Sequence, residues 1–208
     1  MNRLLRSAFV LSAALAAATV LRAEDKTYYV GHHVKYVNIS FESQTDLENI
    51  VGSTNQAKGE IHFDAAAETG SVTLTVPVAS MKTGIDQRDE HMRSPGWLDA
   101  AKNPDIVFTS RKVTFGKEKT SAEVVGDFTL HGVTKEITVT VSWKPVPQEA
   151  AEKAGFPKGE WLRFTTEFDV KLSEYGVKVP DMAVAKVSDT WKVRMSVFAG
   201  TAKPEEKK

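Results

Sequence analysis

Apolar and polar residues alternate along several stretches of this 208-residue chain, and this pattern constrains its fold more strongly than any other feature. Successive side chains of an extended chain point to opposite faces, so a period of two predicts strands with one buried and one exposed face. The clearest alternating stretches are residues 71–78, 136–143, 162–172 and 191–197.

Four further stretches are strand-like but less regular: residues 34–41, 60–64, 105–115 and 122–131. Within the first of them, Val34 and Tyr36 have the opposite parity to Val37 and Phe41, which predicts a bulge or bend between the two pairs. Eight such segments predict an all-β fold, either an antiparallel sandwich or a closed barrel. Short helical turns are expected in two connections, residues 82–103 and 147–155.

The first 23 residues have the pattern of a secretory signal peptide. Arg3 and Arg6 precede a short apolar run, and Ala23 offers a small residue for cleavage. The alternative is a membrane anchor, but about 15 apolar residues fall short of the roughly 20 that span a bilayer. We therefore expect residues 24–208 to form a single domain, periplasmic or secreted, that does not span a membrane once mature.

An outer-membrane barrel is the main alternative to a soluble domain, since it is also exported and built from strands. The apolar face of the strands carries Trp143, Phe164 and Trp191, which are bulky side chains typical of a soluble core. The other face carries Thr, Lys, Glu and Asp. This distribution favours the soluble fold.

Composition excludes several classes of function. The chain has no cysteine, which excludes disulfides, thiol catalysis and thiolate metal sites. Its 27 basic and 27 acidic residues balance, which disfavours nucleic acid as a partner. The five histidines have no metal-binding spacing, and no catalytic, phosphate-binding or dinucleotide-binding motif is present, so we expect no metal, no cofactor and no enzymatic activity.

The densest polar cluster is residues 86–93, DQRDEHMR. On a helical turn Arg88 and His91 share a face, where they are candidates for contacting an anionic head group. The alternative is that Arg88 and Asp89 brace the irregular connection to the sheet, and we favour this interpretation.

Several motifs resemble the signatures of YceI-like proteins, in order and spacing, across residues 28–200. They are Thr83-Gly84, residues 88–94 (RDEHMRS), residues 104–110 (PDIVFTS), residues 126–135 (GDFTLHGVTK) and the weaker residues 171–177 (KLSEYGV). Two departures concern the first strand, which reads HHVKYVNISFESQT, and the connection, where Met92 and Trp97-Leu98 replace more common residues.

The resemblance implies a lipocalin-like, eight-stranded antiparallel barrel that is exported to the periplasm. It also implies a long apolar ligand inside the barrel, such as a polyisoprenoid or a fatty-acid derivative. The sequence does not determine which ligand is bound, in which pathway the protein acts, or whether the barrel interior is open. A homodimer is a candidate assembly.

We expect side chains on the apolar faces of the strands to line such a barrel. Trp97 and Leu98, in the connection, are expected to act as a lid. The lining candidates from the strands are Phe41, Phe63, Val76, Phe108, Phe128, Phe164 and Trp191. The leading hypothesis is an exported protein that binds a long apolar ligand for transport, storage or a stress response. The alternatives are a packed barrel without ligand, acting in stress or interaction, and an enzyme acting on a lipid head group.

Overall fold

The computed structural model describes residues 26–32, 34–64 and 66–204. The predicted signal peptide lies outside the described residues and stays a prediction. Ten strands are described: β1 (Lys26–Val30), β2 (Val37–Gln44), β3 (Asn49–Thr54), β4 (Lys58–Asp64), β5 (Thr69–Pro77), β6 (Asp105–Phe115), β7 (Ser121–Leu130), β8 (Val133–Pro145), β9 (Trp161–Lys171) and β10 (Thr190–Gly200).

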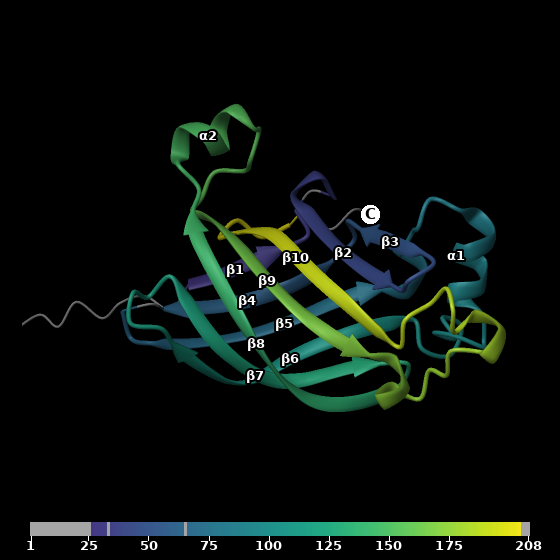
Figure 1. Cartoon of the computed structure of the whole chain (residues 1–208). Coiled ribbons are helices and arrows are strands. Elements are labelled where there is room, and N and C mark those ends of the chain that lie inside the picture. The colour runs from purple at the N-terminus through teal and green to yellow at the C-terminus, as the bar shows by residue number, and fades with distance from the viewer. Residues whose placement is uncertain (1–25, 33, 65, 205–208) are drawn as a thin grey trace, which may run out of the picture.

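Two α-helices and four short 3₁₀ helices lie in the connections. They are α1 (Asp86–Arg93), α2 (Gln148–Lys153), η1 (Val34–Tyr36), η2 (Val78–Ser80), η3 (Leu172–Tyr175) and η4 (Asp181–Ala183). Figure 1 shows α1 at one end of the barrel, whereas α2 stands away from the strands near the other end. Both predicted helical connections therefore contain a short helix.

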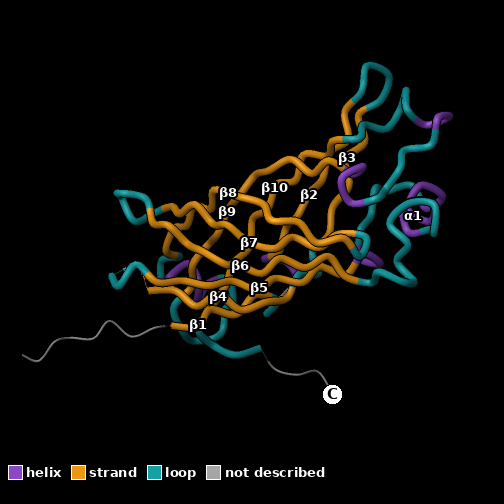
Figure 2. The backbone as a smooth tube through the Cα atoms, turned by 90° about the horizontal axis from the view of Figure 1, so that it is seen from below, coloured by secondary structure: helices purple, strands orange, loops and turns teal. Residues whose placement is uncertain are grey.

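The strands form one antiparallel sheet that closes on itself. The order is β1-β4-β5-β6-β7-β8-β9-β10-β2-β3, and β1 also pairs with β10, which completes the ring (Figures 1 and 2). Closure pairs the edges of an open sheet with each other, and only β3 keeps one side without a strand partner among the described residues, where Ser53 forms an isolated bridge to Lys82. The predicted all-β antiparallel barrel is confirmed.

Two positions in the ring are each filled by two strands lying end to end. Tyr29 and Val30 of β1 pair with the end of β10, and β2 pairs with the rest of β10 through residues 37–43. The helix η1 separates β1 from β2, which is where the change of parity predicts a bend. In the same way β3 pairs with β2 and β4 pairs with β1, so the ten strands occupy eight positions.

Eight of the ten strands correspond to segments predicted from the sequence, whereas β1 and β3 were not predicted. The pattern of β3 is hidden because its inward positions are Ile50, Gly52 and Thr54, of which only the first is a large apolar residue. The aromatic ring of Phe41 on β2 lies over Gly52, its partner across the ladder, and supplies the apolar volume that glycine lacks. An apolar face shared between neighbouring strands is invisible to a pattern read along one strand.

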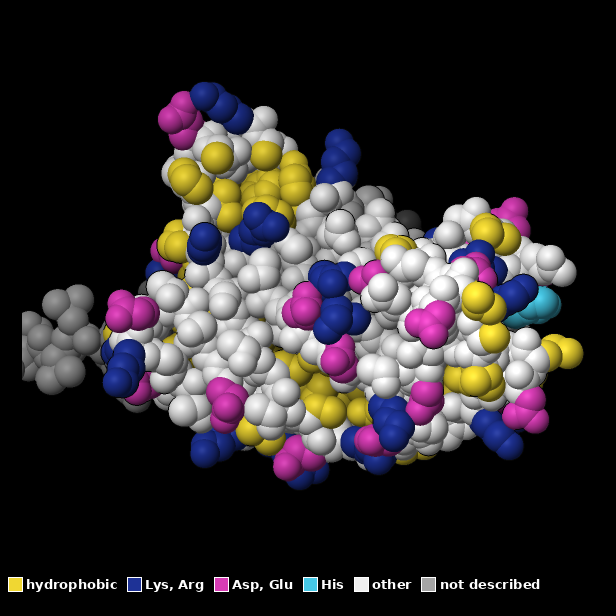
Figure 3. Space-filling view, viewed as in Figure 1, with side chains coloured by type: hydrophobic (Ala, Val, Ile, Leu, Met, Phe, Trp, Pro, Cys, Tyr) yellow, Lys and Arg dark blue, Asp and Glu magenta, His cyan; other side chains and the backbone are white. Residues whose placement is uncertain are grey.

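The buried core has two parts. One lies inside the barrel and includes Trp143, Phe164 and Val197. The other lies at the α1 end, where Leu98 and Leu172 from two different connections are fully buried. Charged side chains are scattered over the outside of the barrel (Figure 3), as expected for strands with one solvated face.

Candidate ligand-binding cavity

The barrel interior is not completely filled, because a cavity of about 170 Å³ remains between the side chains. The predicted lining residues on the strands point inward and lie on the cavity wall. Leu98, from the connection between β5 and β6, adds to this wall at the α1 end. Of the candidates from sequence, those on the wall are Phe41, Phe63, Val76, Leu98, Phe108, Phe128, Phe164 and Trp191. Whether they contact a ligand stays a prediction.

The cavity wall is almost entirely apolar. Apart from two indoles, the polar side chains among its described lining residues are those of Thr54, His62, Ser71 and Thr166. His62 lies on β4 with its Nδ1 atom 3.0 Å from the Thr27 hydroxyl and its side chain partly exposed. A space of this character favours apolar ligand groups and disfavours charged ones, because an ion transferred there loses its hydration.

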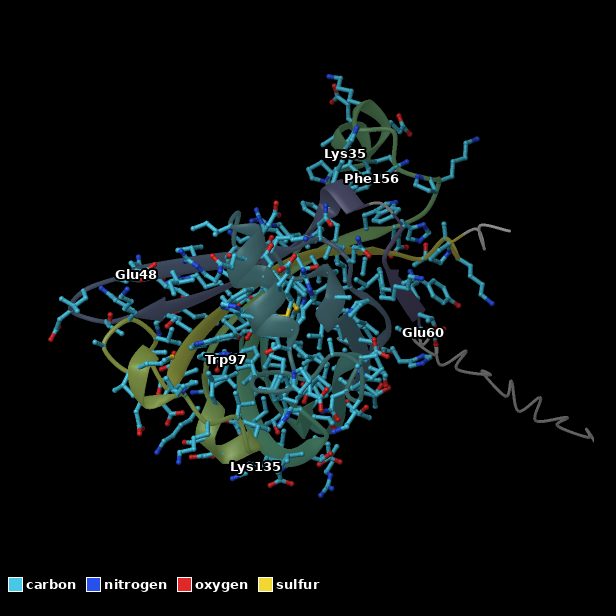
Figure 4. The ribbon with its side chains drawn as sticks, turned by 90° about the vertical axis from the view of Figure 1, so that its right-hand side faces the viewer. Lys35, Glu48, Glu60, Trp97, Lys135 and Phe156 are labelled. Carbon is cyan, nitrogen blue, oxygen red and sulfur yellow. The ribbon has the colours of Figure 1, made fainter. Side chains whose placement is uncertain are left out.

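A second, outer pocket of about 450 Å³ lies at the α1 end. Its wall combines α1, the turn between β2 and β3, and the segment around η4, so it brings together residues far apart in sequence. Its polar lining residues include Glu48, Gln87, Arg88, His91 and Lys186. Figure 4 looks onto this end, with Glu48 on the β2–β3 hairpin.

Trp97 lines this outer pocket and is not among the residues on the wall of the barrel cavity. Leu98, its neighbour in sequence, is fully buried and lines the barrel cavity instead. The two residues that the sequence analysis grouped as a lid therefore contribute to two different spaces. Figure 4 shows Trp97 near the middle of the α1 end.

Phe41 and Trp191 form the wall that the two spaces share, since both residues line both of them. Their rings stack with centroids 4.9 Å apart and an angle of 18° between the planes. Phe41 comes from β2 and Trp191 from the start of β10. The Nε1 atom of Trp191 is buried and has no hydrogen-bond partner among the described residues.

Arg88 lies in the outer pocket, where it forms an ion pair with Glu48 at 3.1 Å. This contact joins α1 to the turn between β2 and β3. His91 is exposed on the same pocket, and no carboxylate of the described residues pairs with it. The geometry thus gives Arg88 a bracing contact, while its role toward a head group stays a prediction.

Asp89 is 1% exposed and holds the start of the connection together. Its Oδ1 atom accepts hydrogen bonds from the backbone N–H and the hydroxyl of Thr83, at 2.7 and 2.8 Å. The Nζ atom of Lys82 lies 3.6 Å from Oδ2. Burial raises the pKa of Asp89, but these hydrogen bonds and nearby positive charges outweigh it and lower the pKa overall.

Neither a metal site nor a helical membrane span is found in the part of the chain that the structure describes. No group of three or more His, Asp or Glu side chains there gathers to hold a metal ion. None of the helices there is long and apolar enough to cross a bilayer. His131 lies in the turn between β7 and β8, with its Nδ1 atom 3.1 Å from the carbonyl oxygen of Tyr175.

The sequence matches the YceI-like domain over residues 32–199, which run from just before η1 through nearly all of β10. The chain belongs to the YceI-like family. A UPF0312 protein of Pseudomonas savastanoi pv. phaseolicola is 31% identical over 172 residues, which cover 80% of each chain. Another, from Pseudomonas fluorescens, is 33% identical over 170 residues, covering 81% of this chain and 84% of the relative.

Solved structures agree with this YceI-like fold. BcnA of Burkholderia cenocepacia has a TM-score of 0.67 and 20% identity, with 81% of this chain and 99% of BcnA covered. A polyisoprenoid binding domain from Saccharophagus degradans, implicated in plant cell wall breakdown, has a TM-score of 0.61 and 16% identity. That comparison covers 86% of this chain and all of the domain. At these identities the likeness establishes the fold.

Three residues of the outer pocket of this YceI-like protein, Arg88, His91 and Trp97, are candidates from sequence, but the rest of its wall is not predicted. Met182 and Lys186 line the pocket from the segment around η4, where the sequence has no periodic pattern. Exposed apolar side chains cluster at the same end, with Leu47, Ile85 and Met182 at 73%, 50% and 92% exposure. The sequence signal that points to this end is the polar cluster of residues 86–93, which supplies Arg88 and His91 to the pocket.

Proposed function

We propose that this YceI-like protein binds an apolar ligand, a polyisoprenoid or fatty-acid-like lipid, inside its barrel. The observation that carries the proposal is the cavity of about 170 Å³ with an almost wholly apolar wall. Transfer of apolar groups from water contributes about 0.8 kcal/mol per buried CH₂, so such a wall binds without a charged anchor. A neighbour in fold that is a polyisoprenoid binding domain supports the same class of ligand.

The length of the ligand depends on the outer pocket. An apolar cavity of about 150 Å³ holds one benzene molecule, so the barrel cavity alone takes only a short part of a long chain. The outer pocket of about 450 Å³ shares Phe41 and Trp191 with it. We therefore propose that a long ligand crosses this shared wall, with its apolar end in the barrel and its remainder in the outer pocket.

A binding role fits the residues better than an enzymatic one. Acid–base or nucleophilic catalysis needs paired groups within hydrogen-bond reach. His91, the candidate from sequence, is exposed and has no carboxylate partner among the described residues. We also propose that the protein works outside the cytoplasm, because residues 1–23 have the pattern of a signal peptide.

The test is to fill the cavity. Val139 on β8 is buried and lines the cavity, whereas the adjacent Thr138 is exposed. Val139→Phe places a ring inside the barrel, and Thr138→Phe places the same ring outside on the same strand. Filling a cavity commonly adds about 0.5–2 kcal/mol of stability, and a substitution at an exposed site changes stability by about 0.5 kcal/mol or less, so both variants should fold, as checked by circular dichroism.

Lipid that copurifies with each protein under mild conditions is then extracted and identified by mass spectrometry. The wild type and Thr138→Phe should carry an apolar lipid, and Val139→Phe should carry little or none. A wild type that carries no lipid and binds none added would contradict the proposal and favour the packed-barrel alternative. Equal lipid in the folded Val139→Phe variant would also contradict it.

A further inference from the structure

Trp191 carries a buried hydrogen-bond donor that the protein itself leaves unused. The side chain is 8% exposed, and its Nε1 atom has no acceptor among the described residues. A buried indole N–H usually finds a partner, because leaving such a donor unpaired in the interior is unfavourable. The contrast is Trp161, whose Nε1 donates to the carbonyl oxygen of Pro157 at 2.9 Å.

The position of this donor links it to the ligand spaces. Trp191 lines both the barrel cavity and the outer pocket, and it stacks on Phe41, the other residue common to both. A ligand that crosses from one space to the other passes this indole. A hydrogen bond from this N–H to the ligand would offset the cost of burying the donor.

We propose that Trp191 selects ligands that carry an uncharged hydrogen-bond acceptor, such as a ketone, ester or amide oxygen, where the chain crosses the shared wall. This inference rests on the proposed lipid-binding function and specifies the chemistry of its ligand. The apolar part of the ligand lies in the barrel, and the acceptor oxygen faces Nε1 of Trp191. A pure hydrocarbon fits the apolar cavity but leaves the N–H of Trp191 without a hydrogen-bond acceptor.

The acceptor is uncharged because the surroundings of Trp191 do not support an anion. No acidic or basic side chain apart from that of His62 is found among the described residues of the cavity wall. In the outer pocket Arg88 is already paired with Glu48, which offsets its charge. Lys186 is exposed, so its charge is screened by solvent.

The experiment compares three probes with eleven carbons each: undecane, 2-undecanone and undecanoate. Their dissociation constants are measured with the full mature chain by displacement of a fluorescent fatty-acid analogue. The variants are Trp191→Phe, which removes the donor and keeps an aromatic ring, and Trp143→Phe as the matched control. Trp143 also lines the cavity, so its substitution removes an indole from the same wall.

The wild type should bind 2-undecanone about tenfold more tightly than undecane, equivalent to about 1.4 kcal/mol. Undecanoate should bind more weakly than the ketone. Trp191→Phe should bind undecane and the ketone equally, whereas Trp143→Phe should weaken both and keep the ratio between them. The indole N–H resonance of Trp191 should move downfield with the ketone and stay in place with undecane.

Three results overturn the inference. In the first, the wild type binds ketone and alkane equally and the Trp191 resonance does not move, although both bind; the lipid-binding function then survives without this selectivity. In the second, undecanoate binds most tightly and keeps its advantage in Trp191→Phe, which assigns recognition to the cations of the outer pocket. In the third, none of the probes binds, and the proposed function fails as well.

The resonance shift is measured on the wild type, so it tests the inference even where Trp191→Phe does not fold. The chain has four tryptophans, and substitution of the other three assigns the signal of Trp191 by elimination.

Discussion

Asp89 is a buried carboxylate whose charge is compensated by its immediate neighbours. Both hydrogen bonds from Thr83 reach one of its oxygens, and Lys82 lies near the other. Burying an unpaired charge is costly, so these contacts explain how a charged residue tolerates 1% exposure. They also fix the beginning of the connection that carries α1.

Asp89→Asn should lower the free energy of unfolding at pH 7 by about 1–3 kcal/mol, because it removes the charge that these groups stabilise. The pKa of Asp89 is lowered in the folded state. Its contribution is therefore present above the unfolded pKa of about 3.9 and is lost as the pH falls through the lower folded pKa. Urea unfolding should show the wild type and the variant converging below about pH 4.

Asp86→Asn is the matched control, since Asp86 is exposed on the same helix. It should change the free energy of unfolding by less than about 0.5 kcal/mol. A difference between wild type and Asp89→Asn that stays constant down to low pH would show that charge is not the cause.

At the scale of elements, the Arg88–Glu48 ion pair joins the connection between β5 and β6 to the turn between β2 and β3. Both side chains are about one third exposed, at 29% and 34%, so solvent screens the pair. A double-mutant cycle with Arg88→Gln and Glu48→Gln should give a coupling energy of about 0.2–1 kcal/mol. Thermal or urea unfolding of the four proteins measures it.

The same Arg88→Gln variant separates bracing from head-group recognition. Bracing predicts a lower melting temperature and equal weakening of a charged lipid and a neutral alcohol of the same chain length. A head-group role predicts an unchanged melting temperature and a selective loss for the charged lipid, by about 1.5–3 kcal/mol. Zero coupling to Glu48 together with selective loss would reject the bracing interpretation.

Strands β2 and β3 fit together through the contact of Phe41 with Gly52. A Cβ atom on Gly52 would clash with the Cζ atom of Phe41. Gly52→Ala should therefore displace the Phe41 ring, disturb its stacking on Trp191 and lower the free energy of unfolding by about 1–3 kcal/mol. Urea unfolding and tryptophan fluorescence measure the two effects.

Gly96→Ala is the control for this substitution. The nearest atom to a Cβ there is 3.9 Å away, and the position needs no left-handed backbone. This variant should be neutral or more stable by up to about 1 kcal/mol. Gly52→Ala with wild-type stability and fluorescence would show that Phe41 has room to move.

Export concerns the whole molecule. Cleavage after Ala23 removes three arginines and no acid, so 24 basic and 27 acidic residues are expected in the exported chain. Intact-mass spectrometry of protein expressed in a bacterium with a periplasm should find an N-terminus near Glu24. Recovery of soluble protein that keeps Met1 would contradict the signal-peptide prediction.

The sequence by itself determined the all-β class and the faces of the strands, and its resemblance to a known family implied the barrel. A period of two fixes which side chains share a face, and burial of the apolar face then places Val76, Phe128 and Phe164 inside. The motifs at residues 83–110 and 126–135 determined the family, because their spacing is specific. Both signals are local, so they are readable along the chain.

Only the tertiary structure decided how the ends of the barrel are built. The missed strand β3 takes its apolar cover from Phe41 on the neighbouring strand, and the outer pocket joins Glu48, Arg88 and Lys186 from three separate segments. The unpaired N–H of Trp191 likewise depends on which acceptors packing brings near it. Contacts between distant segments leave no period in the sequence, since each segment contributes only one or two side chains.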